Sequence, residues 1–351
     1  MFDLNEYNYD LPDDLIAQKP ASSRDRSLLL VVERSKGSFS DHRFSELPGL
    51  LRAGDLLVVN NTKVFPARLY GRKESGGRIE VLVIEPPSSD RNGSHTHWCL
   101  LKSSKRPRRG SRLFFDEQAF GTVKELREDG RAKIAFQGVT SLESLLAKKG
   151  CMPLPPYIKW GDQKGRELRA RRRYQTIFAR SRGSIAAPTA GLHFTPRLIE
   201  RLRQRGIDVV ELTHHVGHGT FRPVRSEDIR RHKIGAEKYS IGEPTALAIM
   251  RTKRAGGRVV AVGTTVVRAL ETVAASKGDV VPEDGETELV IVPGFRFKAI
   301  DAMITNFHLP RSSLLFLVAA FAGLELVKQA YRWAVQEQYR FYSYGDAMLI
   351  L

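Results

Sequence analysis

The sequence predicts a mixed α/β protein with a barrel-like main domain, into which a small antiparallel β-barrel domain is inserted. Three observations lead to this prediction: helix and strand patterns alternate as far as about residue 60, short strand patterns follow to residue 138, and the alternation returns after Gly150. The α/β domain would then combine residues 1–61 and 151–351, with residues 62–150 as the inserted domain. A length of 351 residues agrees with about two domains.

After the alternating helix and strand patterns of the first 60 residues, the chain as far as residue 138 contains mainly strand patterns. Asp10 precedes Leu11-Pro12 as a helix N-cap does, and residues 28–33 and 55–60 are apolar and β-branched like buried strands. Turns at 76–77, 92–93 and 129–130 then separate five short strand patterns, at 64–73, 78–85, 97–103, 122–128 and 131–138. These closely spaced strands predict the inserted antiparallel barrel.

Helices and strands alternate again in the second half of the chain. Thr195-Pro196 begins a helix that Gly206 ends, residues 258–263 form a strand leading into a helix from Thr264, and residues 288–292 form another strand. Residues 312–327 follow Pro310 and predict a buried core helix, which Glu325 and its length make unsuited to spanning a bilayer.

Charge and cysteine content restrict the class of protein. The 56 Lys and Arg residues outnumber the 39 Asp and Glu residues, and a net charge of +17 favours a polyanionic partner such as nucleic acid. Cys99 and Cys151 lie far apart without CxxC spacing, which favours a reducing compartment. The acidic, polar amino terminus is neither a signal peptide nor a transit peptide. We therefore expect a cytoplasmic protein without a membrane partner.

The stretch LTHHVGHGTF, residues 212–221, raises three alternatives for its histidines: metal ligands, proton-transfer groups, or ordinary core and surface side chains. The apolar residues before it predict a strand, and Gly217 and Gly219 predict a strand exit, so His214 and His218 face one side and His215 the other. No HExxH or paired CxxC accompanies them, which disfavours a metal. Proton transfer at a strand end is the favoured reading.

Two turns predict ligand contacts. In SIAAPTAGLHFT, residues 184–195, Thr189 and Gly191 can bring a hydroxyl and backbone N–H groups to a ligand, although Thr195-Pro196 alone would explain a helix start. In AVGTTVVRALE, residues 261–271, a strand runs into a helix whose first N–H groups and hydroxyls suit a carboxylate or phosphate, or simply form an N-cap. Arg268 would then lie on the solvated helix face unless it binds substrate.

Two later segments place polar residues among apolar ones. DAMITNFHLPRSS, residues 301–313, puts Asp301, Asn306 and His308 at a strand exit, where buried polar groups need partners or a ligand. YRFYSYGDAMLIL, residues 339–351, has Tyr344 and Asp346 around a glycine, as a ligand site or a β-bulge has.

Two basic clusters are candidate RNA surfaces, since Lys and Arg neutralise phosphates and adjacent aromatic rings stack on bases. A solvated face is the plainer alternative. The first cluster lies in the predicted barrel and the second near Tyr157; together they comprise Lys102, Lys105, Arg106, Arg108, Arg109, Arg171, Arg172 and Arg173.

Seven segments in one order resemble the S-adenosylmethionine:tRNA ribosyltransferase-isomerase family of queuosine biosynthesis. They are CMPLPPYI (151–158), YQTIFA (174–179), AAPTAGLHFT (186–195), HVGHGTFRPV (215–224), VAVGTTVVRALE (260–271), TNFHLPRSSLL (305–315) and YRFYSYGDAMLI (339–350). Two amino-terminal segments, FDLNEYNYDLPDDLIAQKP (2–20) and GDLLVVNNTKVFPARLYGRK (54–73), fit as well, so the resemblance covers nearly the whole chain.

The resemblance implies an enzyme that moves the ribosyl part of S-adenosylmethionine onto 7-aminomethyl-7-deazaguanosine (preQ1) at the tRNA wobble position. Adenine and methionine are released and epoxyqueuosine remains, so S-adenosylmethionine is a consumed substrate and no metal or further cofactor is expected. The reaction needs a base beside the sulfonium and a donor for the leaving adenine. The resemblance also implies the two-domain fold, and we expect a monomer.

The site residues follow from these segments. The expected catalytic residues are His193, His215, His308 and Asp301. The expected contacts to S-adenosylmethionine or preQ1 are Thr189, Gly191, Gly217, Thr264, Thr265, Arg268, Asn306, Tyr344 and Asp346.

The chain departs from the family pattern at two places. Gly235 stands where the family has the second histidine of H-x-M-H-x-E, and His214 is an extra histidine before His215, which matches the family position. We expect replacement of His215 to lower turnover and replacement of His214 to have little effect. A metal-dependent hydrolase and a noncatalytic RNA-binding module are the competing classes. A methyltransferase is disfavoured because GHGTFR lacks a third glycine and runs into Pro223.

Overall fold

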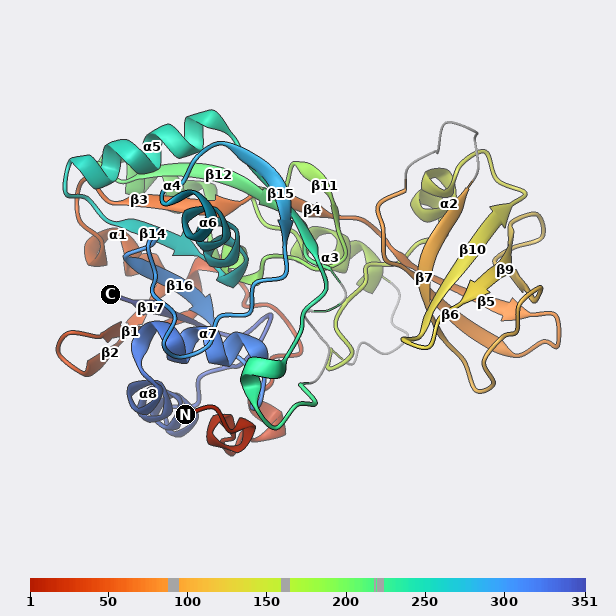
Figure 1. Cartoon of the computed structure of the whole chain (residues 1–351), viewed down its shortest axis with the longest axis horizontal. Coiled ribbons are helices and arrows are strands. Elements are labelled where there is room, and N and C mark those ends of the chain that lie inside the picture. The colour runs from red at the N-terminus through yellow and green to blue at the C-terminus, as the bar shows by residue number, and fades with distance from the viewer. Residues whose placement is uncertain (88–94, 159–164, 218, 220–223) are drawn as a thin grey trace.

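The computed structural model describes residues 1–87, 95–158, 165–217, 219 and 224–351. A large mixed sheet with helices on both faces stands beside a closed β-barrel (Figure 1). The predicted turn at 92–93, along with His218, lies outside the described residues. The predicted fold class, an α/β unit with an inserted antiparallel barrel, is confirmed.

The main sheet has nine strands in the order β15-β13-β12-β3-β14-β16-β17-β1-β2. Its strands, in chain order, are β1 Leu28–Glu33, β2 Ser38–Arg43, β3 Leu56–Asn60, β12 Asp208–His214, β13 Glu237–Ile241, β14 Val259–Val262, β15 Glu283–Thr287, β16 Ala302–Asn306 and β17 Ala347–Ile350. The sheet ends at β15 and at the polar, exposed strand β2, so it is open, whereas the sequence had predicted a barrel-like form.

Strand β3 lies inside the main sheet, next to the middle strand β14, and all five of its residues are buried. It pairs in parallel with β12 on one side and β14 on the other, and β14 pairs in parallel with β16. The carboxyl ends of these four strands therefore lie at one edge of the sheet, where α/β proteins bind ligands.

Alternate residues of β3 pack into two separate cores. Leu56 and Val58 face a core shared with α5 Glu243–Arg254, α6 Thr264–Lys277, α7 Ser313–Ala322 and α8 Leu324–Gln336. Leu57 and Val59 face a second core shared with α1 Leu47–Leu50 and α4 Pro196–Gln204. This alternation is the two-residue period of a strand that is covered on both faces.

The barrel is closed by six antiparallel strands in the order β10-β7-β6-β5-β8-β9. They are β5 Arg68–Lys73, β6 Arg78–Val83, β7 Thr96–Lys102, β8 Arg112–Phe114, β9 Phe120–Leu126 and β10 Arg131–Gln137. Helix α2 Leu142–Lys149 packs three leucines into the barrel core. The sequence predicted five of these strands, while the three-residue β8 was too short to leave a pattern.

A two-stranded sheet joins the units: β4 Thr62–Val64 pairs in parallel with β11 Ser181–Ser184. Helix α3 Arg166–Arg173 lies between the main sheet and the barrel (Figure 1). The predicted domain boundaries at residues 61 and 150 stay a prediction.

Three predicted elements differ in the structure. No strand forms at 288–292. The strand in this region is β15, just before those residues, because residues 283–287 pair with β13. Asp10 caps no helix, and the 3₁₀ turn there is Asp13–Leu15. The predicted helix at 312–327 breaks at Gly323, whose φ of 90° suits glycine, into α7 and α8 at an angle of 115°.

No single helix among the described residues is long and apolar enough to cross a membrane. Helices α7 and α8 reach that length and apolar character only when the bent pair is counted as one segment, and α7 is mostly buried inside the protein.

Candidate active site

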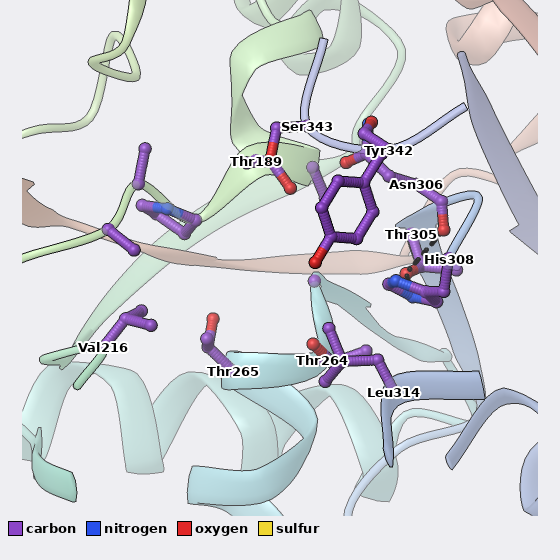
Figure 2. A pocket seen from close by; sticks show the side chains of 15 residues that line it. Thr189, Val216, Thr264, Thr265, Thr305, Asn306, His308, Leu314, Tyr342 and Ser343 are labelled. Carbon is purple, nitrogen blue, oxygen red and sulfur yellow. Dashed lines mark hydrogen bonds between the residues drawn. The ribbon is translucent and has the colours of Figure 1, made fainter. Parts of the chain in front are cut away.

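A pocket opens at the carboxyl ends of β14 and β16, with about 540 Å³ of empty space when the adjoining open solvent is included (Figure 2). The segments that line it come from the turn after β11, the loop after β12, the start of α6 and the bend before β17. The lining residues are Ala186, Ala187, Pro188, Thr189, Ala190, Val216, Gly263, Thr264, Thr265, Thr305, Asn306, His308, Leu314, Tyr342 and Ser343.

The start of α6 forms one wall of the pocket. Gly263 has a φ of 94°, which allows the chain to turn directly from β14 into the helix. The hydroxyl of Thr265 accepts a hydrogen bond from the Asn60 amide at the end of β3, 3.2 Å away. The N–H groups of Val266 and Val267 bond to the Gly263 carbonyl, which leaves those of Thr264 and Thr265 at the start of this 14-residue helix, so this wall favours an acceptor or anionic group.

Asn306 is buried at the end of β16 and is held by a chain of polar contacts. Its Nδ2 donates to Nε2 of His193, 3.2 Å away, and Nδ1 of His193 lies 2.7 Å from the Ser27 hydroxyl. Burial, with the nearby Arg340 and Arg24 cations, lowers the pKa of His193 to about 3, so the ring is neutral. Oδ1 of Asn306 is buried without a hydrogen-bond partner among the described residues, which leaves an acceptor for a ligand.

His308 lies beside Asn306 in the pocket wall. Its Nε2 is 2.8 Å from the Thr305 hydroxyl, a contact drawn in Figure 2, and its backbone N–H donates to the Tyr331 hydroxyl at 3.1 Å. Burial lowers the pKa of His308 to about 3, which keeps the imidazole in its neutral form. The neutral ring can accept a proton, although a pKa this far below 7 makes it a weaker base than an ordinary histidine.

The opposite wall is a bend before β17. Tyr342 has a φ of 75°, an uncommon conformation for a residue with a side chain, and its ring points into the pocket (Figure 2). The bend is fixed by a Tyr157–Ser343 hydrogen bond and by edge contact of the Tyr157 and Tyr342 rings, whose centroids are 4.1 Å apart. Strained residues of this kind concentrate at binding sites.

The structure gives different surroundings to the two adjacent histidines at the end of β12, His214 in the strand and His215 just after it. His214 is fully buried: Nε2 is 3.0 Å from Glu237 and Nδ1 is 2.8 Å from the Thr265 carbonyl. Both ring nitrogens of His214 have partners, and the small effect expected of its replacement on turnover stays a prediction. His215 is half-buried, bonds to the Thr62 hydroxyl at 2.7 Å and does not line the pocket. Burial lowers its pKa.

Several predicted site residues lie elsewhere. Asp301 precedes β16, at the end of that strand opposite to Asn306, and its carboxylate accepts from the Val259 N–H; the expectation of a strand exit there is wrong. Arg268 is buried against Glu237, so the solvated-face alternative is also wrong. Asp346 accepts from the Leu28 and Arg340 N–H groups and supports the bend.

The glycines and Tyr344 have packing roles close to the pocket. A Cβ on Gly191 would lie 2.9 Å from Thr176, and the Gly217 N–H donates to Glu237 at 2.7 Å. Tyr344 lies behind the bend, in a second hollow. Thr189, Thr264, Thr265, Asn306 and His308 are thus the predicted residues that the pocket brings together.

The sequence did not indicate the Tyr342–Ser343 wall, because only the backbone bend distinguishes these two residues. It also did not indicate Glu237 as a site residue, although Glu237 is the glutamate of the family pattern H-x-M-H-x-E. A Cβ on Gly235 would meet nothing within 4 Å, so the backbone leaves room for the histidine that this chain lacks.

The two basic clusters differ in exposure. Lys102, Lys105, Arg106, Arg108 and Arg109 are all exposed on the barrel. On α3, Arg172 is exposed, whereas Arg171 pairs with Glu167 and Arg173 donates to backbone carbonyls of residues 21 and 22. Among the residues that the structure describes, no group of three His, Cys, Asp or Glu side chains is placed to hold a metal.

Residues 4–350 match the family model described as queuosine biosynthesis protein. The chain belongs to this family. The family predicted from the sequence is thereby confirmed.

Curated relatives agree with the family. One from Citrifermentans bemidjiense is 48% identical over 348 residues, and one from Symbiobacterium thermophilum is 49% identical over 351, each comparison covering 99% of both chains. Both are named S-adenosylmethionine:tRNA ribosyltransferase-isomerase. A crystal structure of S-adenosylmethionine tRNA ribosyltransferase from Thermotoga maritima is 38% identical, with a TM-score of 0.54 and coverage of 99% of this queuosine-family chain and 100% of that one.

Proposed function

We propose that the protein transfers and isomerises the ribosyl moiety of S-adenosylmethionine onto preQ1 at the wobble position of tRNA, giving epoxyqueuosine and releasing adenine and methionine. The observation that carries the proposal is the pocket at the strand ends, in a chain 48% identical over its length to relatives named for this transfer. Its walls offer an unpartnered carbonyl oxygen, a neutral imidazole and free helix N–H groups.

His308 is the group that we assign to proton transfer with the substrate. Of the four expected catalytic residues, it is the one that lines the pocket. Because Nε2 is engaged by Thr305, proton exchange would use Nδ1. His193 acts through Asn306 and is a positioning residue, and Oδ1 of Asn306 suits an N–H donor such as the aminomethyl group of preQ1.

The same proposal places tRNA along α3 and the exposed barrel cluster, since both present arginines to solvent. We propose a monomeric, cytoplasmic enzyme that uses S-adenosylmethionine as substrate without a metal.

The decisive experiment incubates the protein with S-adenosylmethionine and a preQ1-containing tRNA. We expect adenine and methionine in equal amounts and epoxyqueuosine in the digested tRNA by mass spectrometry. A tRNA with guanine at the wobble position is the control substrate and should release no adenine. Equal adenine release with both tRNAs, or no release with either, would contradict the proposal.

The role of His308 is tested by His308→Ala, with His42→Ala on the edge strand β2 as the matched control. Loss of a positioned acid or base lowers turnover by about 10²- to 10⁴-fold. Binding of S-adenosylmethionine should change far less. An equal effect of the two substitutions would remove His308 from the mechanism.

A further inference from the structure

A second, narrow hollow, with about 300 Å³ of empty space when the adjoining open solvent is included, lies behind the bend that forms the pocket wall, and Ser343 lines both spaces. Its cationic side chains come from three distant parts of the chain: Arg24, Arg173 and Arg340. The other residues that line it are Pro20, Ala21, Ser27, Leu192, His193, Ser343, Tyr344 and Gly345, and none is acidic. We call this space the arginine hollow.

The positive charge of the arginine hollow is poorly compensated. Arg340 lies 3.3 Å from Asp346, which also accepts two backbone N–H groups. Arg24 donates to the carbonyls of Leu192 and Gln175, at 3.1 and 2.8 Å, rather than to a carboxylate. Burial, together with the neighbouring Arg173 cation, lowers the pKa of Arg24, as expected where cations are gathered without counter-charges.

Two donors in the arginine hollow have no hydrogen-bond partner among the described residues. The Tyr344 hydroxyl is buried and unpartnered, with 4% of the residue exposed, and Nε of Arg173 is also buried without an acceptor. Burial raises the pKa of Tyr344, so its hydroxyl keeps the proton and acts as a donor. Buried donors without acceptors are costly unless a ligand satisfies them.

We propose that the arginine hollow binds an oxyanion of the substrate whose reacting part occupies the first pocket, and that this oxyanion is a backbone phosphate of the RNA next to the modified nucleotide. The proposal rests on the proposed function. The guanidinium N–H groups that remain beside their backbone contacts, together with a hydroxyl donor, match a phosphate, and Ser343 borders both spaces.

The position of α3 favours RNA over the other source of an oxyanion, the carboxylate of S-adenosylmethionine. Arg173 ends this helix in the hollow, while Arg169 and Arg172 are exposed on the same helix and extend the positive surface outwards. A polyanion can follow such a surface into the hollow, whereas an isolated carboxylate gains nothing from it.

The test measures binding rather than turnover. Dissociation constants are compared for a preQ1-containing anticodon stem-loop and for S-adenosylmethionine in Tyr344→Phe and Arg173→Gln. Arg169→Gln is the control, because it removes the same charge from the same helix outside the hollow. Tyr344→Phe deletes a hydroxyl that has no partner, so a merely structural role predicts an unchanged or higher thermal midpoint.

We expect Tyr344→Phe and Arg173→Gln each to weaken stem-loop binding by about tenfold, with a smaller loss in Arg169→Gln and less than a twofold change for S-adenosylmethionine. A loss of S-adenosylmethionine affinity with RNA binding intact would identify the carboxylate as the occupant and overturn the phosphate assignment. Unchanged affinities for both would overturn the site.

A second measurement starts from the unaltered protein. Neutral methylphosphonates replace, one at a time, the phosphates on either side of preQ1, and binding to the unaltered protein is measured. One position should weaken binding about tenfold and have no further effect in Tyr344→Phe. A scan without a sensitive phosphate would refute the proposal. Absence of adenine release by the unaltered protein is a separate outcome that would refute the proposed function alone.

Discussion

The substitution Glu237→Gln is expected to destabilise the main sheet strongly. Glu237 is 3% exposed, lies between His214 and Arg268, and accepts the Gly217 N–H. Burial by itself raises the pKa of this carboxyl, but the His214 hydrogen bond and the Arg268 charge outweigh it and lower the pKa from 4.5 to about 2. A difference of this size corresponds to about 3 kcal/mol of folding free energy, similar to the loss when one partner of a buried ion pair is removed.

The sign of the pH dependence follows from the direction of the shift. Because the folded-state pKa of Glu237 lies below its ordinary value, the stabilisation is complete above about pH 5 and is lost as the pH falls towards 2. Glu237→Gln should therefore remove about 3 kcal/mol at pH 7 and flatten the decline of stability in acid.

Amide hydrogen exchange in β12 and β13, measured from pH 7 down to about pH 2.5, reports on the sheet without interference from the barrel. The exposed Glu243, in the first turn of α5, provides the control Glu243→Gln. A loss at pH 7 below about 1 kcal/mol in Glu237→Gln, or an equal loss in the control, would show that the ion pairs do not hold these strands together.

Three further outcomes are expected. Gly183→Ala places a Cβ 2.6 Å from the His215 ring and should lower stability by about 1–3 kcal/mol, whereas Gly235→Ala, with open space around it, should not; equal melting curves would contradict this. Replacing the exposed Lys102–Arg109 cations with glutamine should reduce the salt dependence of tRNA binding, and an unchanged slope would move the RNA surface elsewhere. A chain joined from residue 61 to 151 by a short linker should still unfold cooperatively, and a broad transition would count against the predicted domain boundaries.

The sequence predicts elements best where the signal is local. Thr195 accepts from the Leu198 N–H at 3.1 Å and caps α4, as the Thr-Pro pair indicates. The apolar run of β3 is buried on both faces, as its composition predicts. The strand predicted at 288–292 fails because that apolar segment packs Ile291 onto the core without pairing, while the polar segment Glu283–Thr287 pairs at the sheet edge.

The same distinction between local and distant signals holds for the site residues. Asn306 ends β16 and His308 follows it closely, so the sequence indicates their place at the end of a strand. The cluster of His214, Glu237 and Arg268 connects β12, β13 and α6. No local sequence pattern predicts these contacts, because they depend on the order of strands in the sheet.

Arg68, the first residue of the barrel strands, and Cys151, which follows the barrel and α2, are side by side in the structure. The Arg68 N–H donates to the Cys151 carbonyl at 3.1 Å, and the Cys151 N–H returns a bond to Arg68 at 2.7 Å. From the standpoint of the main sheet, the whole insertion is therefore equivalent to a tight loop. A contiguous barrel that closes early in folding would bring β4 and the chain after Gly150 together and shorten the search for the parallel pairing of β3 with β12 and β14. Early closure of the barrel would therefore lower the loop-closure cost of folding the domain into which it is inserted.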